Sequence, residues 1–406
     1  MTRVVVTGVG CISALGRGKA PTWAAALSGQ SRIIRVQVPG TDPTLFTEAP
    51  IAAVAETDCA APENLADGRI FKLLDRFSKL AVISTDEALT ESGAIAAYAP
   101  DDIAVIFGSS TGGLTSLEDA YYRVYGQRGS RVHPMTVPRF MGSASASAIS
   151  LAFGITGPAW CLSSACASSA HAIAEAVHYI KAGRAKMVIA GGAEASLTHG
   201  HLMAWQSLGA LARDTCRPFS LDRSGMAAGE GASTLILEDY DAARRRGAPI
   251  YAEITGSGFS SDAYHITQPK PEGAAKAMRQ ALKESGLAAN KRLLISTHGT
   301  GTPLNDLSEA MALRSVFGED VNNHLAIATK SAHGHLMGAT GALEFLLGIL
   351  ALKEGVAPPV CNFTQADPEC ALPLVLGEPQ RIQDMALLSN SFAFGGLNSV
   401  LVANLI

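Results

Sequence analysis

The chain has 406 residues, of which 48% are hydrophobic and 17% are charged, and its formal net charge at pH 7 is −4. This composition is typical of a compact globular protein and excludes long disordered stretches, while the length suits two domains or one duplicated domain. The small negative charge gives no reason to expect nucleic acid as a partner, although a local basic patch for an acidic protein is not excluded.

The seven cysteines are odd in number, widely scattered and without CxxC spacing: Cys11, Cys59, Cys161, Cys166, Cys216, Cys361 and Cys370. Neither a disulfide framework nor a zinc site is indicated, and a reducing cytoplasm fits this pattern best. No run approaches the roughly 18 apolar residues of a membrane span. The N-terminal VVVTGVGCISALG has the length of a secretory hydrophobic region, but without a clear cleavage site we interpret it as a buried strand entering a glycine turn.

In chain order, residues 3–10 predict a first buried strand, and the glycines after it do not form a dinucleotide loop because Ser13 replaces the third glycine. Residues 71–93 have helical patterning, with Lys72 and Arg76 four residues apart on one predicted face. These cations are candidates for docking a partner, or simply solvated charges.

A second strand is predicted at 103–114, where FGSSTGG ends in small residues and glycines. The region that follows is less regular and contains Arg123, Arg128 and Arg131 before the chain reaches Cys166. Further strands are predicted at 187–195 and within 219–237.

Cys166 is predicted at a turn between a short strand and a helix whose buried face is formed by Ile173, Ala176, Val177 and Ile180. At the N-terminus of a helix, unpaired backbone N–H groups and the helix dipole favour a thiolate. The small residues around it allow a long thin substrate to approach. A nucleophile is one interpretation of this turn, and a buried inert cysteine is the other.

The second half of the sequence repeats the pattern of the first. After the basic run RRRG at 244–247, residues 325–350 again have a strand, a small-residue turn and a helix face, here formed by Leu343, Leu346, Leu347 and Leu350. We therefore predict an α/β fold of two duplicated halves, an N-terminal half at 1–248 and a C-terminal half at 249–406.

In α/β sheets, reactive groups collect at the carboxyl ends of strands. Such predicted ends carry FGSSTGG at 107–113, Cys166, THGTGTPLND at 297–306, TKSAHGHLMGATG at 329–341 and SNSFAFGGLN at 389–398. No HExxH or thiolate set accompanies the histidines, so a metal site is not expected.

Two histidines beside a thiol suit a site that stabilises an oxyanion or enolate, because neutral imidazole N–H groups can donate to a thioester oxygen. Lys330 adds positive charge, and an N–H in FAFGGLN could form an oxyanion hole with the N–H of Cys166. This chemistry is carbon–carbon bond formation on thioesters.

The motifs SSACASSAHAI, THGTGTPLND, TKSAHGHLMGATGALE and SNSFAFGGLN resemble, in order and spacing, the signatures of the β-ketoacyl-(acyl-carrier-protein) synthases, type I/II, of the thiolase-like superfamily. The resemblance covers nearly the whole chain. It implies a layered α-β-α-β-α architecture and a decarboxylative condensation of a carrier-bound acyl group with malonyl-acyl carrier protein. No cofactor is expected, since the substrate is carried on the phosphopantetheine of the carrier.

By this resemblance Cys166 is the nucleophile that takes the acyl group, and His298 and His335 promote malonyl decarboxylation and stabilise the enolate. Lys330 is expected to support the histidine pair electrostatically, and Glu344 to be a buried organising carboxylate.

The resemblance also makes Phe394 the gate beside the cysteine, with its backbone N–H completing the oxyanion hole. Thr300 and Thr302 are expected to line the phosphopantetheine channel. The residues alone do not choose between His333 and His335, whereas the family's GHxxGA pattern selects His335.

The chain departs from the usual GFGGTN of the family at Ala393 and Leu397, and Gly209 stands where several carrier-docking relatives have Arg. The FAFGGLN form resembles synthases of polyene and aryl-polyene pathways, which often work with a cysteine-less chain-length partner. The expected partners are therefore an acyl carrier protein, docked by Lys72, Arg76, Arg128 and Arg131, and a dimer partner approached by the turn at 107–114.

Three functions remain open from the sequence: a homodimeric condensing enzyme of fatty-acid synthesis, a catalytic subunit paired with a chain-length factor, and a non-catalytic chain-length partner. The presence of Cys166, His298 and His335 together argues against the third, because that role needs no nucleophile.

Overall fold

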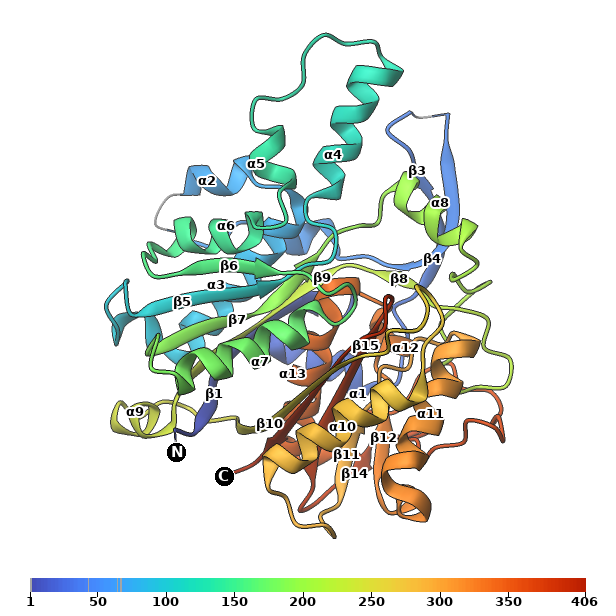
Figure 1. The fold of residues 1–406 in the computed structure, drawn as a ribbon. Coiled ribbons are helices and arrows are strands. Elements are labelled where there is room, and N and C mark those ends of the chain that lie inside the picture. Colours follow the sequence, from blue (N-terminus) through green and yellow to red (C-terminus); the bar gives the residue numbers. More distant parts are fainter. Residues whose placement is uncertain (1, 43, 64, 66–67) are drawn as a thin grey trace.

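Two sets of five strands, one from each half of the chain, lie side by side in one large mixed sheet (Figure 1). The computed structural model describes residues 2–42, 44–63, 65 and 68–406. The first set has the order β6-β5-β7-β9-β1 and the second has the order β12-β11-β15-β16-β10. The strands are β1 Val4–Ser13, β5 Ile103–Gly108, β6 Ala159–Leu162, β7 Met187–Glu194, β9 Gly231–Asp239, β10 Ala252–Ser261, β11 Leu293–Ser296, β12 Leu325–Ile327, β15 Ala386–Ala393 and β16 Leu397–Asn404.

Counted within its own half, each set has the same spatial order: third, second, fourth, fifth and first strand. The first strands β1 and β10 join the two sets through a short antiparallel pairing, with Val5 opposite Glu253 and Val6 opposite Ala252. The expectation of two duplicated α/β halves is confirmed. The boundary between residues 248 and 249 stays a prediction.

Helices cover both outer faces of the sheet sets and fill the space between them (Figure 1). Helices α3 and α6 pack outside the first set, α10 and α11 pack outside the second, and α7 and α13 lie between. The predicted α-β-α-β-α layering is confirmed. The α-helices are α1 Lys19–Leu27, α2 Gly68–Leu73, α3 Arg76–Ser92, α4 Leu114–Tyr121, α5 Thr136–Phe140, α6 Ala144–Phe153, α7 Ser168–Lys181, α8 His199–Ser207, α9 Tyr240–Arg245, α10 Pro271–Ser285, α11 Pro303–Phe317, α12 Lys330–His333 and α13 Thr340–Glu354.

Smaller elements decorate this frame. Strand β2 Gly16–Arg17 pairs with β1, and β3 Ile34–Pro39, β4 Phe46–Ala52 and β8 Ala228–Gly229 form a three-stranded sheet. Strands β13 Val356–Ala357 and β14 Gln380–Arg381 pair with each other. Across the described residues, we find no helix with both the length and the apolar character needed to span a membrane.

The two central helices touch at their N-terminal turns. The backbone N–H of Ala342 in α13 donates a hydrogen bond to Ser169 Oγ in α7 at 2.9 Å. A Cβ atom added to Gly341 would lie 3.1 Å from Ala170 Cβ, so a small residue is needed there. Helix α13 is buried along Thr340–Leu352, more completely than the single face predicted from its leucines.

The helical pattern at 71–93 forms two helices rather than one. Helix α3 begins after Asp75, whose carboxylate accepts hydrogen bonds from Phe77 N at 3.2 Å and from Ser116 N at 2.9 Å. This N-cap interrupts the predicted helix. The expectation that Lys72 and Arg76 share one helix face is therefore wrong, since Lys72 belongs to α2 and Arg76 begins α3.

Glycines let a helix approach the first strand of each half closely. A Cβ atom on Gly10 of β1 would lie 2.0 Å from Ser84 O in α3, and one on Gly258 of β10 would lie 2.0 Å from Ala277 O in α10. The GxG at 8–10 resembles part of a nucleotide-binding loop, but its glycines serve to let a helix pack closely on the strand. The same arrangement occurs at 256–258.

We predict that Gly258→Ala lowers the free energy of unfolding by about 1–3 kcal/mol, the usual cost of overpacking a rigid interior. Urea unfolding of the purified protein measures this change. Gly142→Ala is the matched control, because a Cβ atom there meets nothing within 4 Å. Equal stabilities of the two variants would contradict the close strand-to-helix contact.

Candidate active site

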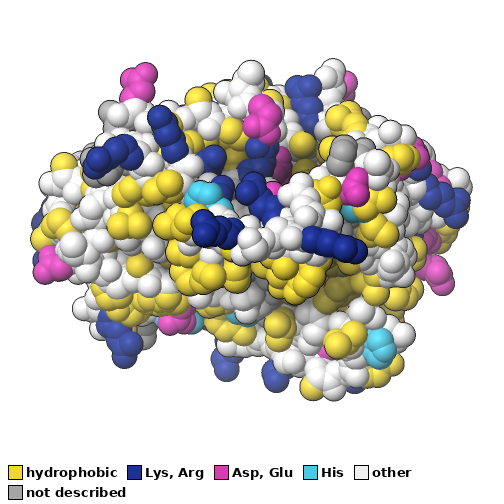
Figure 2. Space-filling view, turned by 90° about the horizontal axis from the view of Figure 1, so that it is seen from above, with side chains coloured by type: hydrophobic (Ala, Val, Ile, Leu, Met, Phe, Trp, Pro, Cys, Tyr) yellow, Lys and Arg dark blue, Asp and Glu magenta, His cyan; other side chains and the backbone are white. Residues whose placement is uncertain are grey.

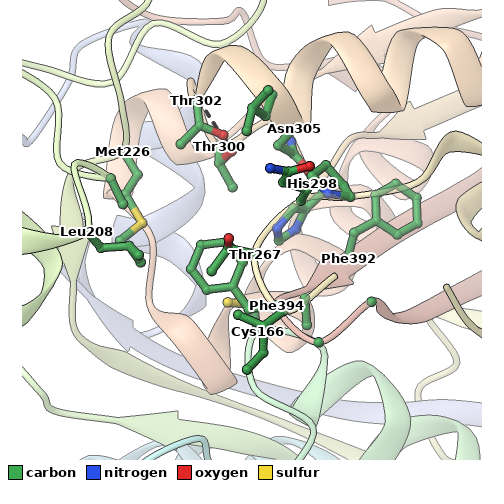
Figure 3. Close-up of a pocket in the computed structure, with 18 of the residues that line it drawn as sticks. Cys166, Leu208, Met226, Thr267, His298, Thr300, Thr302, Asn305, Phe392 and Phe394 are labelled. Atoms are coloured by element: carbon green, nitrogen blue, oxygen red, sulfur yellow. Dashed lines mark hydrogen bonds between the residues drawn. The ribbon is translucent and has the colours of Figure 1, made fainter. Parts of the chain in front are cut away.

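A cavity of about 240 Å³ brings together side chains from both halves of the chain (Figure 3). The first half contributes Cys166, and the second contributes His298, His335 and Phe394. These residues follow β6, β11, β12 and β15, as predicted for the carboxyl ends of strands. The remaining lining is Trp205, Leu208, Gly209, Ala210, Met226, Asp262, His265, Ile266, Thr267, Gln268, Pro269, Thr300, Thr302, Pro303, Leu304, Asn305, Phe392, Ala393, Gly395, Gly396 and Asn398.

The turn that carries Cys166 is closed by Ser168. The Ser168 hydroxyl donates to Ala165 O at 2.6 Å and accepts from Ser164 N at 2.9 Å. Ala165 adopts a φ of 49°, in the left-handed region that favours tight turns. The predicted strand-turn-helix geometry is therefore present, with α7 starting two residues after the cysteine.

The ionisation of Cys166 differs from the sequence expectation of a thiolate. Burial raises the pKa of the Cys166 thiol to about 11. The positive charge of Lys330 and the backbone N–H groups of Cys166 and Phe394 act in the opposite direction but do not outweigh burial. The resting group at neutral pH is thus the thiol. Both backbone N–H groups are near enough to the sulfur to lower its pKa, and this is the place where an oxyanion hole would need them.

The rings of the two site histidines are in edge-to-face contact. Their ring centroids are 5.5 Å apart with planes at 84°. Burial, together with the nearby Lys330, lowers the pKa of both imidazoles well below the ordinary value, so both are neutral at physiological pH. His335 Nδ1 lies 2.9 Å from Thr340 Oγ1, and His335 N donates to Ala227 O at 2.7 Å.

The structure also separates His335 from its neighbour His333. The ring nitrogens of His333 lie 2.8 Å from Gly334 O and 3.0 Å from Thr329 Oγ1. His333 is fully buried in these contacts and lies outside the cavity lining, whereas His335 lines it.

Lys330 is fully buried and lies next to His298. Its Nζ is 2.8 Å from both carboxylate oxygens of Glu344 and 3.4 Å from His298 Nδ1, and it also donates to His298 O. Burial raises the pKa of Glu344, and the lysine opposes that rise. The predicted Lys330 and Glu344 positions therefore form one buried ion pair beside His298.

Two buried carboxylates that the sequence analysis did not single out hold the loop of His298. Glu309 accepts from His298 N at 2.8 Å, Gly299 N at 2.9 Å and Asn390 Nδ2 at 3.0 Å. Asp306 accepts from Phe219 N at 2.8 Å and from Gly301 N at 3.2 Å. Burial raises the pKa of Glu309 to about 7 and that of Asp306 to about 6. The sequence signal that could have found these two carboxylates is their spacing of three residues, which places both on the buried face of α11.

Thr300 and Thr302 line the cavity next to His298, and their hydroxyl oxygens are 2.8 Å apart (Figure 3). Both positions are compatible with a channel for a substrate arm. Across the described residues, no His, Cys, Asp and Glu side chains form a group of three or more that could hold a metal ion.

The Phe394 ring lies beside Cys166 at the end of β15 (Figure 3). The next two residues, Gly395 and Gly396, have φ angles of 82° and 72°, which L-residues with side chains rarely adopt. Phe394 is 39% exposed, whereas His298 and His335 are buried.

The four cations expected to dock a carrier have different environments. Lys72, Arg128 and Arg131 are exposed, whereas Arg76 makes a two-pronged ion pair with buried Glu230 at 2.8 Å and a second contact with Glu56 at 2.6 Å. Arg76 is thus engaged within the fold. Seen from above in Figure 2, Lys and Arg side chains gather among hydrophobic ones on the face where α2, α4 and α5 lie in Figure 1.

Comparisons with known proteins agree with this geometry. Residues 1–243 match the family described as "Beta-ketoacyl synthase, N-terminal domain", and residues 251–364 match "Beta-ketoacyl synthase, C-terminal domain". "Nodulation protein E" of Rhizobium meliloti (strain 1021) is 39% identical over 405 residues, covering 98% of both chains.

"3-oxoacyl-[acyl-carrier-protein] synthase 2" of Staphylococcus aureus (strain COL) is 35% identical over 408 residues, covering 98% of this chain and 97% of the relative. Among solved structures, "The ishigamide ketosynthase/chain length factor" superposes with a TM-score of 0.89 at 29% identity, covering 100% of this chain and 99% of the other.

We predict that alkylation of Cys166 by iodoacetamide accelerates about tenfold per pH unit from neutral pH towards the thiol pKa, because only the thiolate reacts. Lys330→Met should slow the reaction at each of these pH values, since the lysine lowers the thiol pKa. Peptide mass spectrometry separates Cys166 from the other cysteines, and Cys166→Ala gives the background. A rate that levels off near pH 7 would mean that the resting group is a thiolate.

Proposed function

Since this chain belongs to the β-ketoacyl synthase family of thiolase-like fold, we propose that its cavity forms 3-oxoacyl thioesters by way of an acyl-Cys166 intermediate. The reaction is the condensation of an acyl group with malonyl-acyl carrier protein, catalysed by a β-ketoacyl-acyl carrier protein synthase. The assignment of residues to steps is supported by the convergence of Cys166, His298, His335 and the Phe394 N–H on one cavity.

In the first half-reaction, Cys166 sulfur attacks the carbonyl carbon of the carrier-bound acyl thioester. The N–H groups of Cys166 and Phe394 donate to the developing oxyanion. The carrier thiolate leaves and takes up the proton that Cys166 loses, so acyl-Cys166 and a free carrier thiol are formed. Because the resting cysteine is a thiol, this proton must depart as the carbon–sulfur bond forms.

In the second half-reaction, a malonyl thioester occupies the same channel, with its arm along Thr300 and Thr302. Neutral His298 and His335 donate hydrogen bonds to its carbonyl oxygen, which takes the negative charge when carbon dioxide leaves. The enolate carbon attacks the acyl-Cys166 carbonyl, and the cysteine departs as a thiolate, which takes a proton from water to restore the thiol. Lys330 holds His298 while its own charge is paired with Glu344.

The proposed partners are an acyl carrier protein and a dimer partner, which is a second copy or a chain-length factor. The similarity to the solved ketosynthase/chain length factor structure supports a chain-length factor as one of these two possible dimer partners. No cofactor is needed, because the substrate arrives on the phosphopantetheine of its carrier. We also propose that the two halves of the chain divide between residues 248 and 249. A cytoplasmic location is proposed because all seven cysteines are free thiols.

Cys166→Ala is expected to abolish acyl transfer, because no nucleophile remains; intact-protein mass spectrometry after incubation with hexanoyl-carrier protein checks this. His335→Ala should still acquire the acyl mass but lose condensation with malonyl-carrier protein by roughly 100-fold or more, the usual value of an oxyanion donor. A Cys166→Ala protein that gained the adduct would refute the nucleophile. A 3-oxoacyl product from the unmodified chain alone would favour a self-sufficient dimer over a chain-length-factor pair.

Reversing the exposed charges by Arg128→Glu with Arg131→Glu is expected to raise the KM for carrier-bound substrate roughly two- to fivefold at low salt, the range of exposed ion pairs. Lys72→Glu should act in the same direction. Arg381→Glu on β14 is the control for a surface charge elsewhere. Arg76 is unsuitable, because its loss leaves buried Glu230 unpaired. Unchanged KM values would remove these cations from the docking surface.

A further inference from the structure

The gate residue Phe394 rests against a second aromatic side chain, Trp205 of α8. Their ring centroids are 5.7 Å apart with planes tilted by 39°, a favourable offset arrangement. Trp205 lines the same cavity as Cys166, but none of the motifs that carry the chemistry includes it.

Trp205 is held in place by a hydrogen bond from its own helix. Its indole Nε1 donates to His201 Nε2 at 2.7 Å, one helical turn earlier. An indole nitrogen can only donate, so His201 must offer an unprotonated Nε2 and be neutral. Burial lowers the pKa of His201, which agrees with this form.

Helix α8 itself is attached to neighbouring elements on either side. Gly200 N donates to Glu118 in α4 at 3.2 Å, and His199 Nδ1 lies 2.8 Å from Thr47 Oγ1 in β4. Trp205 packs against a buried cluster made of Val38, Ala49, Ile51, Leu202, Ala210, Met226, Ala228 and Met337. These contacts hold the Trp205 indole in one position at the side of the cavity.

The Phe394 ring is less enclosed than the indole. Phe394 is 39% exposed, so part of its side chain faces solvent, and the contact with Trp205 limits where its ring can lie. The backbone N–H of the same residue is near enough to the Cys166 sulfur to lower the pKa of the thiol. A contact that fixes the Phe394 ring consequently also fixes this donor.

We propose that the hydrogen-bonded pair His201–Trp205 is a positioning device for the gate, which holds the Phe394 ring and thereby sets the Phe394 N–H at the reacting thioester. Trp205 and His201 are positioning residues for acyl transfer in this role. The proposal rests on the proposed function, since it assumes that Cys166 takes the acyl group and that Phe394 N–H completes the oxyanion hole.

The test compares the rate at which Cys166 acquires hexanoyl from hexanoyl-carrier protein in the unmodified chain and in four variants. His201→Leu removes the acceptor and keeps the Trp205 ring, Trp205→Phe keeps a ring and removes the donor, and His201→Gln retains an acceptor oxygen. Trp23→Phe on α1 is the control for a tryptophan remote from the gate.

Both His201→Leu and Trp205→Phe should lower the maximal acylation rate roughly two- to tenfold, the value of one aromatic contact, with KM unchanged. His201→Gln should restore most of the rate, and decarboxylation of malonyl-carrier protein, which uses His298 and His335, should persist in all variants. Wild-type acylation in His201→Leu would overturn the proposal. Failure of the unmodified chain to acquire hexanoyl would instead refute the proposed function.

A second measurement tests the contact without any activity. In a chain whose only tryptophan is Trp205, made by Trp23→Phe and Trp160→Phe, the indole emission should move to longer wavelength when Phe394→Ala is added, because water replaces the ring. Leu304→Ala, which also opens the cavity lining, is the control. An unshifted emission in the Phe394→Ala chain would show that Trp205 does not hold the gate.

Discussion

The contact between the N-terminal turns of α7 and α13 is the constraint on which the site depends. Cys166 precedes α7 and His335 precedes α13, so the separation of these two helices sets the separation of Cys166 and His335. The hydrogen bond from Ala342 N to Ser169 Oγ and the missing side chain of Gly341 allow this approach. Because both helices are buried between the two strand sets, neither can move without disturbing the whole interior.

Cys166 and the two site histidines are neutral at physiological pH, and a buried ion pair lies beside them. Lys330 and Glu344 neutralise each other at 2.8 Å, and the lysine charge still lowers the thiol pKa and the imidazole pKa values. Neutral histidines can donate to a developing enolate and need not release a proton before they act. Because burial raises the pKa of Cys166, this side chain is a thiol and not a thiolate when the site is at rest.

The two sides of the cavity differ in how deeply their residues are buried. His298 is fixed through Glu309 and His335 through Ala227, both by backbone hydrogen bonds, whereas the Phe394 turn lies at the accessible end of β15. A preorganised histidine pair suits the stabilisation of an enolate. On the other side of the cavity, the ring contact with Trp205 limits where the Phe394 ring can lie.

The sequence by itself determined the duplicated halves, the strand-to-helix turn at Cys166, and the placement of His298 and the FAFGG turn at strand ends. These features depend on local periodicity and on glycine, which act over a few residues. Only the tertiary structure shows the different contacts of His333 and His335. It also shows that the predicted helix is interrupted at Asp75, whose carboxylate accepts a hydrogen bond from Ser116 N, and that Trp205 lies against Phe394. It also decided that Cys166 rests as a thiol, since the cost of removing charge from water exists only once the two halves pack around the sulfur.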